Sequence, residues 1–232
     1  MITRKNQANL TAAEWNDFID AVNQTHGTTA GAPAYREFVN VHVRAMEMQD
    51  MEAMAWAVHT MGPMMPGRNF LAWHRRLLAR FEQRLRQVHS NIALPYWDTV
   101  SSPSIPAPLA DPPLLSSWSV VRHWNPAELP NQDDMNALKS FGTFGSFQRA
   151  LEITMHNSVH RAVGGNMVSA ASPSDPLFWL HHANIDRIWT EWQKAHPGKK
   201  PSNKSEVLQP KPLFGVKVSS VLNVKSLGYK YA

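Results

Sequence analysis

Cysteine is absent from the 232 residues of the sequence, which excludes disulfide bonds and metal sites built on thiolates. Long apolar runs are also missing, since no stretch approaches the roughly 20 residues that a membrane-spanning helix needs. The N-terminal stretch MITRKNQANLTAAEW contains no apolar run, so we expect no signal peptide. We therefore expect no membrane partner, and a protein that is cytoplasmic or exported by a partner.

A large excess of one charge is missing too. The net charge is +5 with a pI near 9.6, and the Lys and Arg residues are scattered along the chain. The densest basic stretch, WHRRLLARFEQRLR at residues 73–86, spaces its Arg residues around a helix with Glu and Gln between them. This pattern is typical of a solvated helix face rather than of a nucleic-acid-binding patch, so we expect no nucleic-acid partner.

Apolar residues at helical spacing dominate the remaining pattern. A hydrophobic content of 43% and this length fit a single domain over residues 1–232 with a substantial core. Thr11 and Glu14 have the spacing of a capping box at the start of the first helix. The periodicity predicts helices at residues 10–24, 34–60, 69–89, 143–162 and 176–195.

Three stretches break this helical pattern. GTTAGAP at residues 27–33 ends the first helix, and residues 100–131 are rich in Pro and Ser, which predicts a long irregular excursion. The stretch GVKVSSVLNV, beyond Pro197, has a β-like pattern. The sequence thus predicts a mainly α protein built on a four-helix bundle, with long irregular loops and a few short β-strands.

Histidine is the informative residue type, with eleven copies, four of them between His156 and Trp189. His156 and His160 are four apart, which places both rings on one helix face about 6 Å apart along the axis. His182 on the next helix can supply a third ligand, because bundle interiors are common homes for metals. His42 and His74 lie upstream among apolar residues and suggest a second ion.

Taken singly, each of these histidines has a simpler interpretation as a hydrogen-bonded core residue. Taken together, several buried imidazoles need partners for their nitrogens, and metal ions provide them. An all-imidazole set without Cys favours Zn, Cu, Fe or Ni over Mg or Ca. The spacing does not choose among those four metals, and a bundle around one structural zinc stays an alternative.

Three segments carry a family resemblance: NFLAWHRRLLARFE, LPYWD and HNSVH…DPLFWLHHANIDRIWTEWQ. They closely resemble the tyrosinase family of type-3 binuclear copper proteins, and the similarity runs over nearly the whole chain. The resemblance implies two copper ions, each held by three histidines, with dioxygen as co-substrate. Many fungal and plant relatives link a Cys to a ligand His, which this chain cannot do, so it resembles the bacterial type.

The resemblance also implies a ligand set: His42, His59 and His74 for the first copper, and His156, His160 and His182 for the second. His181 then becomes a supporting residue, because the family's third ligand directly precedes the ANIDR-like segment. Family members commonly place the second ligand of the first copper nine residues before the histidine of WHR. Met65 stands at that position here, and we assign the place to His59, which is the only histidine between the other two ligands of that copper.

The activity implied is the ortho-hydroxylation of monophenols and the oxidation of o-diphenols to o-quinones with O2. In the family, a Glu and an Asn next to a ligand His can hold a water that takes the phenol proton, which here points to Glu152 and Asn157. Arg161 is expected at the entrance, and Val168 and Ser169 at the pocket wall, as substrate-binding residues. The simpler interpretations are a surface or helix-pairing carboxylate for Glu152 and a solvated arginine for Arg161.

Other functions remain possible at this point. They are a catechol or o-aminophenol oxidase without hydroxylase activity, and a reversible oxygen carrier. The expected partners are small phenols, O2 and a helper protein that loads copper. Arg4, Tyr229 and Tyr231 resemble the pairing that closes the family's core domain through a cation–π contact. No C-terminal shielding domain follows in this sequence, so we expect no latency from that source.

Overall fold

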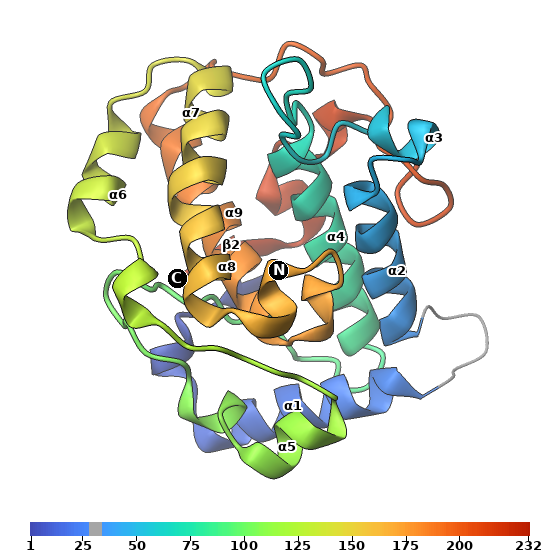
Figure 1. Cartoon of the computed structure of the whole chain (residues 1–232), viewed down its shortest axis with the longest axis vertical. Coiled ribbons are helices and arrows are strands. Elements are labelled where there is room, and N and C mark those ends of the chain that lie inside the picture. The colour runs from blue at the N-terminus through green and yellow to red at the C-terminus, as the bar shows by residue number, and fades with distance from the viewer. Residues whose placement is uncertain (28–33) are drawn as a thin grey trace.

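The protein is described by a computed structural model that covers residues 1–27 and 34–232 (Figure 1). Residues 28–33 of the break predicted at residues 27–33 lie outside the described residues. The helices and strands in chain order are β1 (Ile2–Arg4), α1 (Ala12–His26), α2 (Tyr35–Met46), α3 (Met51–Met54), α4 (Phe70–Leu85), α5 (Pro112–Ser117), α6 (Gln132–Lys139), α7 (Phe144–Leu151), the π-helical turn η4 (Glu152–His156), α8 (Asn157–Val163), α9 (Leu177–Ala195) and β2 (Tyr229–Tyr231).

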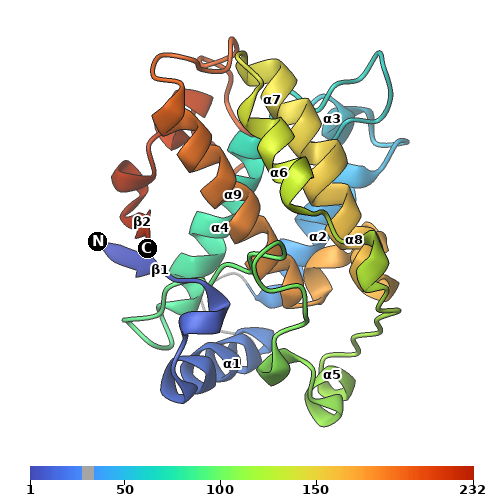
Figure 2. The ribbon, with the colours of Figure 1, turned by 90° about the vertical axis from the view of Figure 1, so that its left-hand side faces the viewer.

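Four helical rods form the bundle: α2, α4, α9 and the continuous run of α7, η4 and α8 (Figures 1 and 2). Helix α1 crosses the foot of the bundle and begins with the predicted capping box between Thr11 and Glu14. The π-helical turn widens one turn between α7 and α8, a distortion that frequently occurs at functional sites. The prediction of a mainly α bundle is confirmed.

Helices α4 and α9 are joined by both apolar and ionic contacts. Phe81 of α4 and Trp179 of α9 are fully buried, and their rings stack with centroids 3.7 Å apart. Arg75 of α4 forms a buried ion pair with Asp186 of α9. The pair is fixed further because the guanidinium of Arg75 lies 3.5 Å from the ring centroid of Trp189. This contact holds together two of the helices that carry candidate ligands.

The two short strands join the start of the chain to its far end. β1 pairs with β2 in parallel, with Ile2 opposite Tyr229. Arg4 is fully buried, and its guanidinium lies 3.6 Å from the ring centroid of Tyr229 and donates to the hydroxyl of Tyr231. The same guanidinium donates two hydrogen bonds to Glu82, each 3.0 Å long. The expected cation–π pairing of Arg4 is therefore present.

Several predicted elements were wrong in extent or type. The helix predicted at 34–60 is divided in two. Helix α2 stops at Met46, where Glu47 has an extended backbone. The separate short helix α3 then begins after Asp50, which accepts a hydrogen bond from the amide of Ala53. The stretch GVKVSSVLNV is not a strand. Its buried residues Val218, Val221 and Val224 recur every third position, which matches the two 3-10 turns found at Val218–Val221 and Val224–Leu227.

The irregular excursion at residues 100–131 contains the helix α5, and helix α6 follows directly after it. Helix α6 was missed, although Asn131 and Asp134 form a capping box at its start. Within residues 1–27 and 34–232, no helix combines the length and apolar character needed to cross a bilayer.

Candidate metal centre

Two groups of histidines lie in the interior of the bundle. The first contains His42, His59 and His74, and the second contains His156, His160, His181 and His182. In each group, one potential ligand atom per residue lies within 4.8 Å of the others. The structure thus brings together all six histidines predicted as ligands, in the predicted two sets, and their role as ligands remains a proposal.

The first group draws on two helices and a loop. His42 projects from α2 and His74 from α4, and both side chains are buried. His59 lies on the segment between α3 and α4 and is 9% exposed, so the loop folds it into the bundle. The Nε2 atoms of His42 and His59 lie 3.3 Å apart, which places both lone pairs toward one point.

Close backbone contacts hold the His59 loop in place. The amide of Asn69 donates to the carbonyl of Ala57 at 2.9 Å, and its side chain donates to the carbonyl of Trp56 at 2.9 Å. Gly67 packs directly on the His59 segment, and a Cβ atom there would lie 2.7 Å from the carbonyl carbon of His59. A longer loop than the family commonly uses can therefore present His59 at the site.

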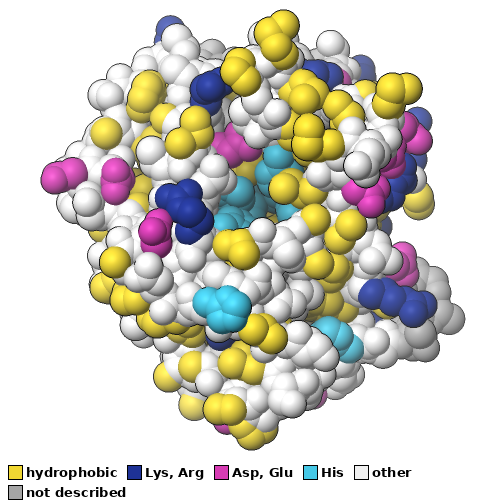
Figure 3. Space-filling model, in the orientation of Figure 1, with side chains coloured by type: hydrophobic (Ala, Val, Ile, Leu, Met, Phe, Trp, Pro, Cys, Tyr) yellow, Lys and Arg dark blue, Asp and Glu magenta, His cyan; other side chains and the backbone are white. Residues whose placement is uncertain are grey.

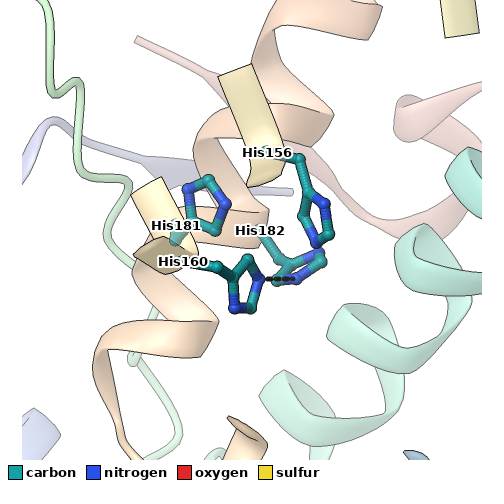
Figure 4. A group of neighbouring side chains, drawn as sticks. All are labelled: His156, His160, His181 and His182. Carbon is teal, nitrogen blue, oxygen red and sulfur yellow. Dashed lines mark hydrogen bonds between the residues drawn. The ribbon is translucent and has the colours of Figure 1, made fainter. Parts of the chain in front are cut away.

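The second group is built almost entirely on helices (Figure 4). His156 ends η4, His160 follows one turn later on α8, and His182 comes from the facing α9. The Nε2 atoms of His160 and His182 lie 3.4 Å apart. Because η4 and α8 are continuous, the spacing of four residues delivers two rings to the same face, as predicted.

Hydrogen bonds at Nδ1 fix the orientation of several rings. Nδ1 donates to a backbone carbonyl in three cases: His42 to Ala170 at 2.7 Å, His74 to Phe70 at 2.8 Å and His160 to Met167. Carbonyl oxygens can only accept, so the proton must be on Nδ1. This tautomer leaves Nε2 as the metal-binding atom, an arrangement typical of histidine ligands.

The remaining ring nitrogens show that these residues fit metal ions. The Nε2 atoms of His74 and His156 are buried and have no hydrogen-bond partner among the described residues. Burying a polar nitrogen without a partner is unfavourable, and coordination to a metal ion removes this cost. Neutral imidazole is also a preferred ligand type for copper.

Electrostatics keep the candidate ligands neutral. Burial is the largest cause, and it lowers the pKa of His42 and of His160 to about 4. The pKa values of the other four candidate ligands lie well below the usual value, again mainly because of burial and then because of neighbouring histidines. At neutral pH the rings are therefore unprotonated and ready to bind a metal.

The two groups share a boundary. The rings of His74 and His182 stack with centroids 4.3 Å apart, although they belong to different groups. His59 and His156 also lie across the boundary, with ring centroids 6.0 Å apart. Two ions held by these groups would thus be close neighbours, as a reaction that uses both metal ions requires.

A cavity of about 280 Å³ opens onto both groups, and Figure 3 shows histidines at the bottom of a surface hollow. Its wall contains four of the six candidate ligands and all five of the other predicted site residues. The complete lining is His42, Met46, His59, Thr60, Glu152, His156, Asn157, His160, Arg161, Met167, Val168, Ser169 and Ser172. His74 and His182 lie behind this wall. The cavity gives small molecules a route to the candidate metal centre.

Glu152 is hydrogen-bonded to Thr60, the residue after the candidate ligand His59, and Asn157 is hydrogen-bonded to the candidate ligand His156. The carboxylate of Glu152 accepts from the amide of Thr60 at 2.8 Å and from its hydroxyl at 2.6 Å. Burial raises the pKa of Glu152, while the bonds from Thr60 act in the opposite direction. The side-chain oxygen of Asn157 accepts from Nδ1 of His156 at 2.9 Å, so Asn157 orients that ring.

The three predicted substrate-binding residues lie at the cavity mouth. Val168 and Ser169 are exposed, with 60% of Val168 accessible to solvent. Arg161 is also exposed, and its guanidinium donates to Glu128 at 3.1 Å. Glu128 was missed by the sequence reasoning, because the pairing spans 33 residues and no local pattern predicts it.

Sequence reasoning also missed Thr60. Thr60 follows His59 directly, but only the fold shows that it binds Glu152. His181 was expected to support the site rather than bind metal, since neighbouring helix positions differ by about 100°. Its ring lies in the second group, stacked on His156 with centroids 5.5 Å apart. That it supports the site rather than binds metal stays a prediction.

Comparison with known proteins agrees with this geometry. The family model described as the common central domain of tyrosinase matches residues 32–131 and 110–195. The tyrosinase of Streptomyces glaucescens is 33% identical over 85% of each chain, and that of Streptomyces antibioticus is 32% identical over the same shares. The grixazone synthase of Streptomyces griseus is 26% identical over 84% of this chain and 85% of its own.

Solved structures share the fold. A functional unit of octopus hemocyanin superposes with a TM-score of 0.81 at 23% identity, covering 100% of this chain and 68% of that one. The polyphenol oxidase of Thermothelomyces thermophila gives 0.74 at 18% identity, covering 100% and 89%. The family match and the Streptomyces relatives establish that this chain belongs to the tyrosinase family and is a type-3 copper phenol oxidase, with two copper ions as cofactors and O2 as co-substrate.

Proposed function

We propose that this phenol oxidase hydroxylates monophenols at the ortho position and oxidises o-diphenols to o-quinones. The observation that supports it best is the cavity of about 280 Å³, which reaches histidines of both groups from the surface. A phenol ring that enters this cavity reaches both candidate copper sites. The six histidines His42, His59, His74, His156, His160 and His182 would hold the two ions, three histidines for each ion.

The two copper ions, when bound, supply the O2 binding and the electron transfer that the protein side chains lack. The residues of the chain hold the rings in place, exclude bulk water and move a proton. A phenol has a pKa of about 10, so it must lose its proton to react quickly near neutral pH. Glu152 lies in the cavity wall and is the proposed acceptor of that proton through a water held with Asn157.

One observation favours a narrower activity as the alternative. Both oxygens of Glu152 already accept hydrogen bonds from Thr60, and the side-chain oxygen of Asn157 accepts from His156. If these bonds persist with substrate bound, the pair has less capacity to hold a water. The enzyme would then oxidise catechols or o-aminophenols without hydroxylating monophenols.

The remaining proposals concern organisation and partners. We propose that residues 1–232 act as one tyrosinase core domain, that Val168, Ser169 and Arg161 contact the substrate, and that a helper protein assists copper loading. Small phenols and O2 are the reactants in either version of the activity.

The test is copper reconstitution of the purified chain, followed by assays on tyramine and on L-DOPA. In Glu152→Gln, we expect tyramine turnover to fall about 100-fold, because the proton acceptor is lost. L-DOPA turnover should change less than about threefold, since catechols ionise more readily. Glu191→Gln is the matched control, because this carboxylate pairs with Arg187 on the outer side of α9.

Two outcomes would contradict parts of this proposal. Wild-type protein with two coppers that oxidises L-DOPA but not tyramine, even with a catalytic diphenol primer, would establish the narrower activity. Equal losses on both substrates in Glu152→Gln would show that Glu152 stabilises the site rather than accepts the phenol proton.

A further inference from the structure

Methionine is concentrated in one short segment beside the first histidine group. Seven of the eleven methionines lie between residues 46 and 65, a segment that makes up less than a tenth of the chain. They are Met46, Met48, Met51, Met54, Met61, Met64 and Met65. The segment includes the whole of α3 and the loop that carries His59. The phenol oxidase activity proposed above uses none of these side chains.

Three of these methionines are not core residues. Met64 is 91% exposed, Met51 is 83% exposed and Met48 is 62% exposed. Three of the exposed large hydrophobic side chains thus come from this single segment. Water-facing thioethers add nothing to core packing, and one of the three, Met64, lines the cavity described next.

A second cavity, distinct from the one at the centre's mouth, lies within this segment. It measures about 140 Å³ and is lined by Met54, Met61, Met64 and Met65, together with His59. The loop around it is fixed, because the amide of Met61 donates to the carbonyl of Met65 at 3.0 Å. Four methionines therefore line one small cavity.

His59 lines both cavities, so it lies at the boundary between the methionine cavity and the cavity that opens onto the histidine centre. Its Nε2 lies 3.3 Å from that of His42. Figure 3 shows hydrophobic side chains gathered along the rim of the hollow that holds the histidines. An ion in the methionine cavity would thus have His59, a member of the first histidine group, as a neighbour.

The chemistry of the lining selects the ion. Thioether sulfur is a soft, uncharged ligand that favours Cu(I) over Zn²⁺, Mg²⁺ or Ca²⁺. The cavity wall contains no carboxylate, and its one cation, Arg68, is paired with Glu206 at 2.9 Å. Since the chain has no Cys, methionine is its only soft ligand type.

We propose that Met54, Met61, Met64 and Met65 form an entry site for Cu(I), which passes the ion to His59. This inference rests on the proposed role of His59 as a ligand of the first copper. The transfer exchanges a thioether for the Nε2 lone pair of His59, and the copper stays Cu(I) with no change in oxidation state. Met65, which stands where the family commonly has its ligand histidine, thus belongs to the delivery route.

The test is anaerobic titration of the apo chain with Cu(I) buffered by bicinchoninate, a coloured chelator. We expect three bound copper ions in wild-type protein and two in the quadruple variant Met54→Leu, Met61→Leu, Met64→Leu and Met65→Leu. Leu conserves the volume of Met, so the packing should survive. The third equivalent in wild type should show sulfur neighbours in copper X-ray absorption.

Loading kinetics give a second measurement. The quadruple variant should fill its histidine centre about tenfold more slowly, because the local copper concentration beside His59 falls. Its final two coppers and its L-DOPA turnover per copper should equal those of wild type. The triple variant Met48→Leu, Met51→Leu and Met135→Leu is the control, since none of these residues lines the cavity, and it should behave as wild type.

Several outcomes would overturn the inference: only two coppers in wild type, a third copper without sulfur neighbours, unchanged loading in the quadruple variant, or an equal loss in the control. Met64→Leu alone guards against misfolding, because its side chain is almost fully exposed, and it should weaken the third site at least about threefold. Failure to bind two coppers at all would instead refute the proposed function, so the two failures are distinguishable.

Discussion

The two histidine groups differ in architecture. In the second group, His156, His160 and His182 project from helices that are packed along their length. In the first group, His59 projects from a loop that is fixed by Thr60, Asn69 and Gly67. A helix sets the direction of its side chains by its own geometry, whereas the loop depends on contacts with the rest of the fold. The first copper site should therefore be the more easily disturbed of the two.

Removing a ligand from each group gives the largest expected effect. His182→Ala and His59→Ala should each leave one copper per chain and reduce L-DOPA turnover by about 1,000-fold, since even supporting residues cost 10–100-fold. Copper analysis and turnover measure this directly. His196→Ala, a histidine outside both groups, is the control. Full activity with two bound coppers in His59→Ala would show that His59 is not a copper ligand.

Acid should affect the two groups of the apo protein alike. His42 and His160 have folded-state pKa values of about 4, below the value of about 6.5 expected in the unfolded chain. The unfolded chain therefore binds protons first, and stability falls as the pH drops from 6.5 toward 4. Between pH 7.5 and pH 5 we expect a loss of roughly 4 kcal/mol from the pair.

Urea unfolding of the apo chain at the two pH values measures this loss, and copper-loaded protein is the comparison, because bound metal opposes protonation of its ligands. A urea midpoint that does not move between pH 7.5 and pH 5 would show that these rings are already protonated or solvated in the folded state.

A change in the loop alone separates the two groups. In Gly67→Ala, the new Cβ would lie 2.7–2.9 Å from backbone atoms of His59, Thr60 and Val58, so the loop must shift. We expect the affinity for the first copper to fall about 10–100-fold while the second copper stays bound. Gly145→Ala is the matched control, because nothing lies within 4 Å of its added Cβ. Equal loss of both coppers would mean that the groups are not independent.

The smallest expected effect lies at the cavity mouth. Arg161→Gln should raise the KM for L-tyrosine about threefold relative to tyramine, which lacks the carboxylate. The effect is small because the side chain of Arg161 is 54% exposed and already pairs with Glu128. A KM ratio that does not change would show that Arg161 does not contact the substrate carboxylate.

The same contrast explains what the sequence could predict. The spacing of His156 and His160 and the apolar face of α4 are local patterns, and both lead directly to the observed helices. Two predictions were wrong: a helix that continues past Met46, and a strand near Val218. Apolar periodicity alone did not show the helix cap at Asp50, and a spacing of three residues was taken for a strand pattern. The bonds from Thr60 to Glu152 and from Arg161 to Glu128 join distant segments, and no local pattern encodes them.

The buried cluster around Asp186 has a consequence for biosynthesis. Its carboxylate lies in the core between Arg4 and Arg75 and accepts hydrogen bonds from the hydroxyls of Tyr229 and Tyr231. During translation these tyrosines emerge well after α4 and α9 have left the ribosome. The helix carrying His182 therefore lacks its full set of stabilising partners until residue 231 has emerged, and productive metallation is expected only after that point.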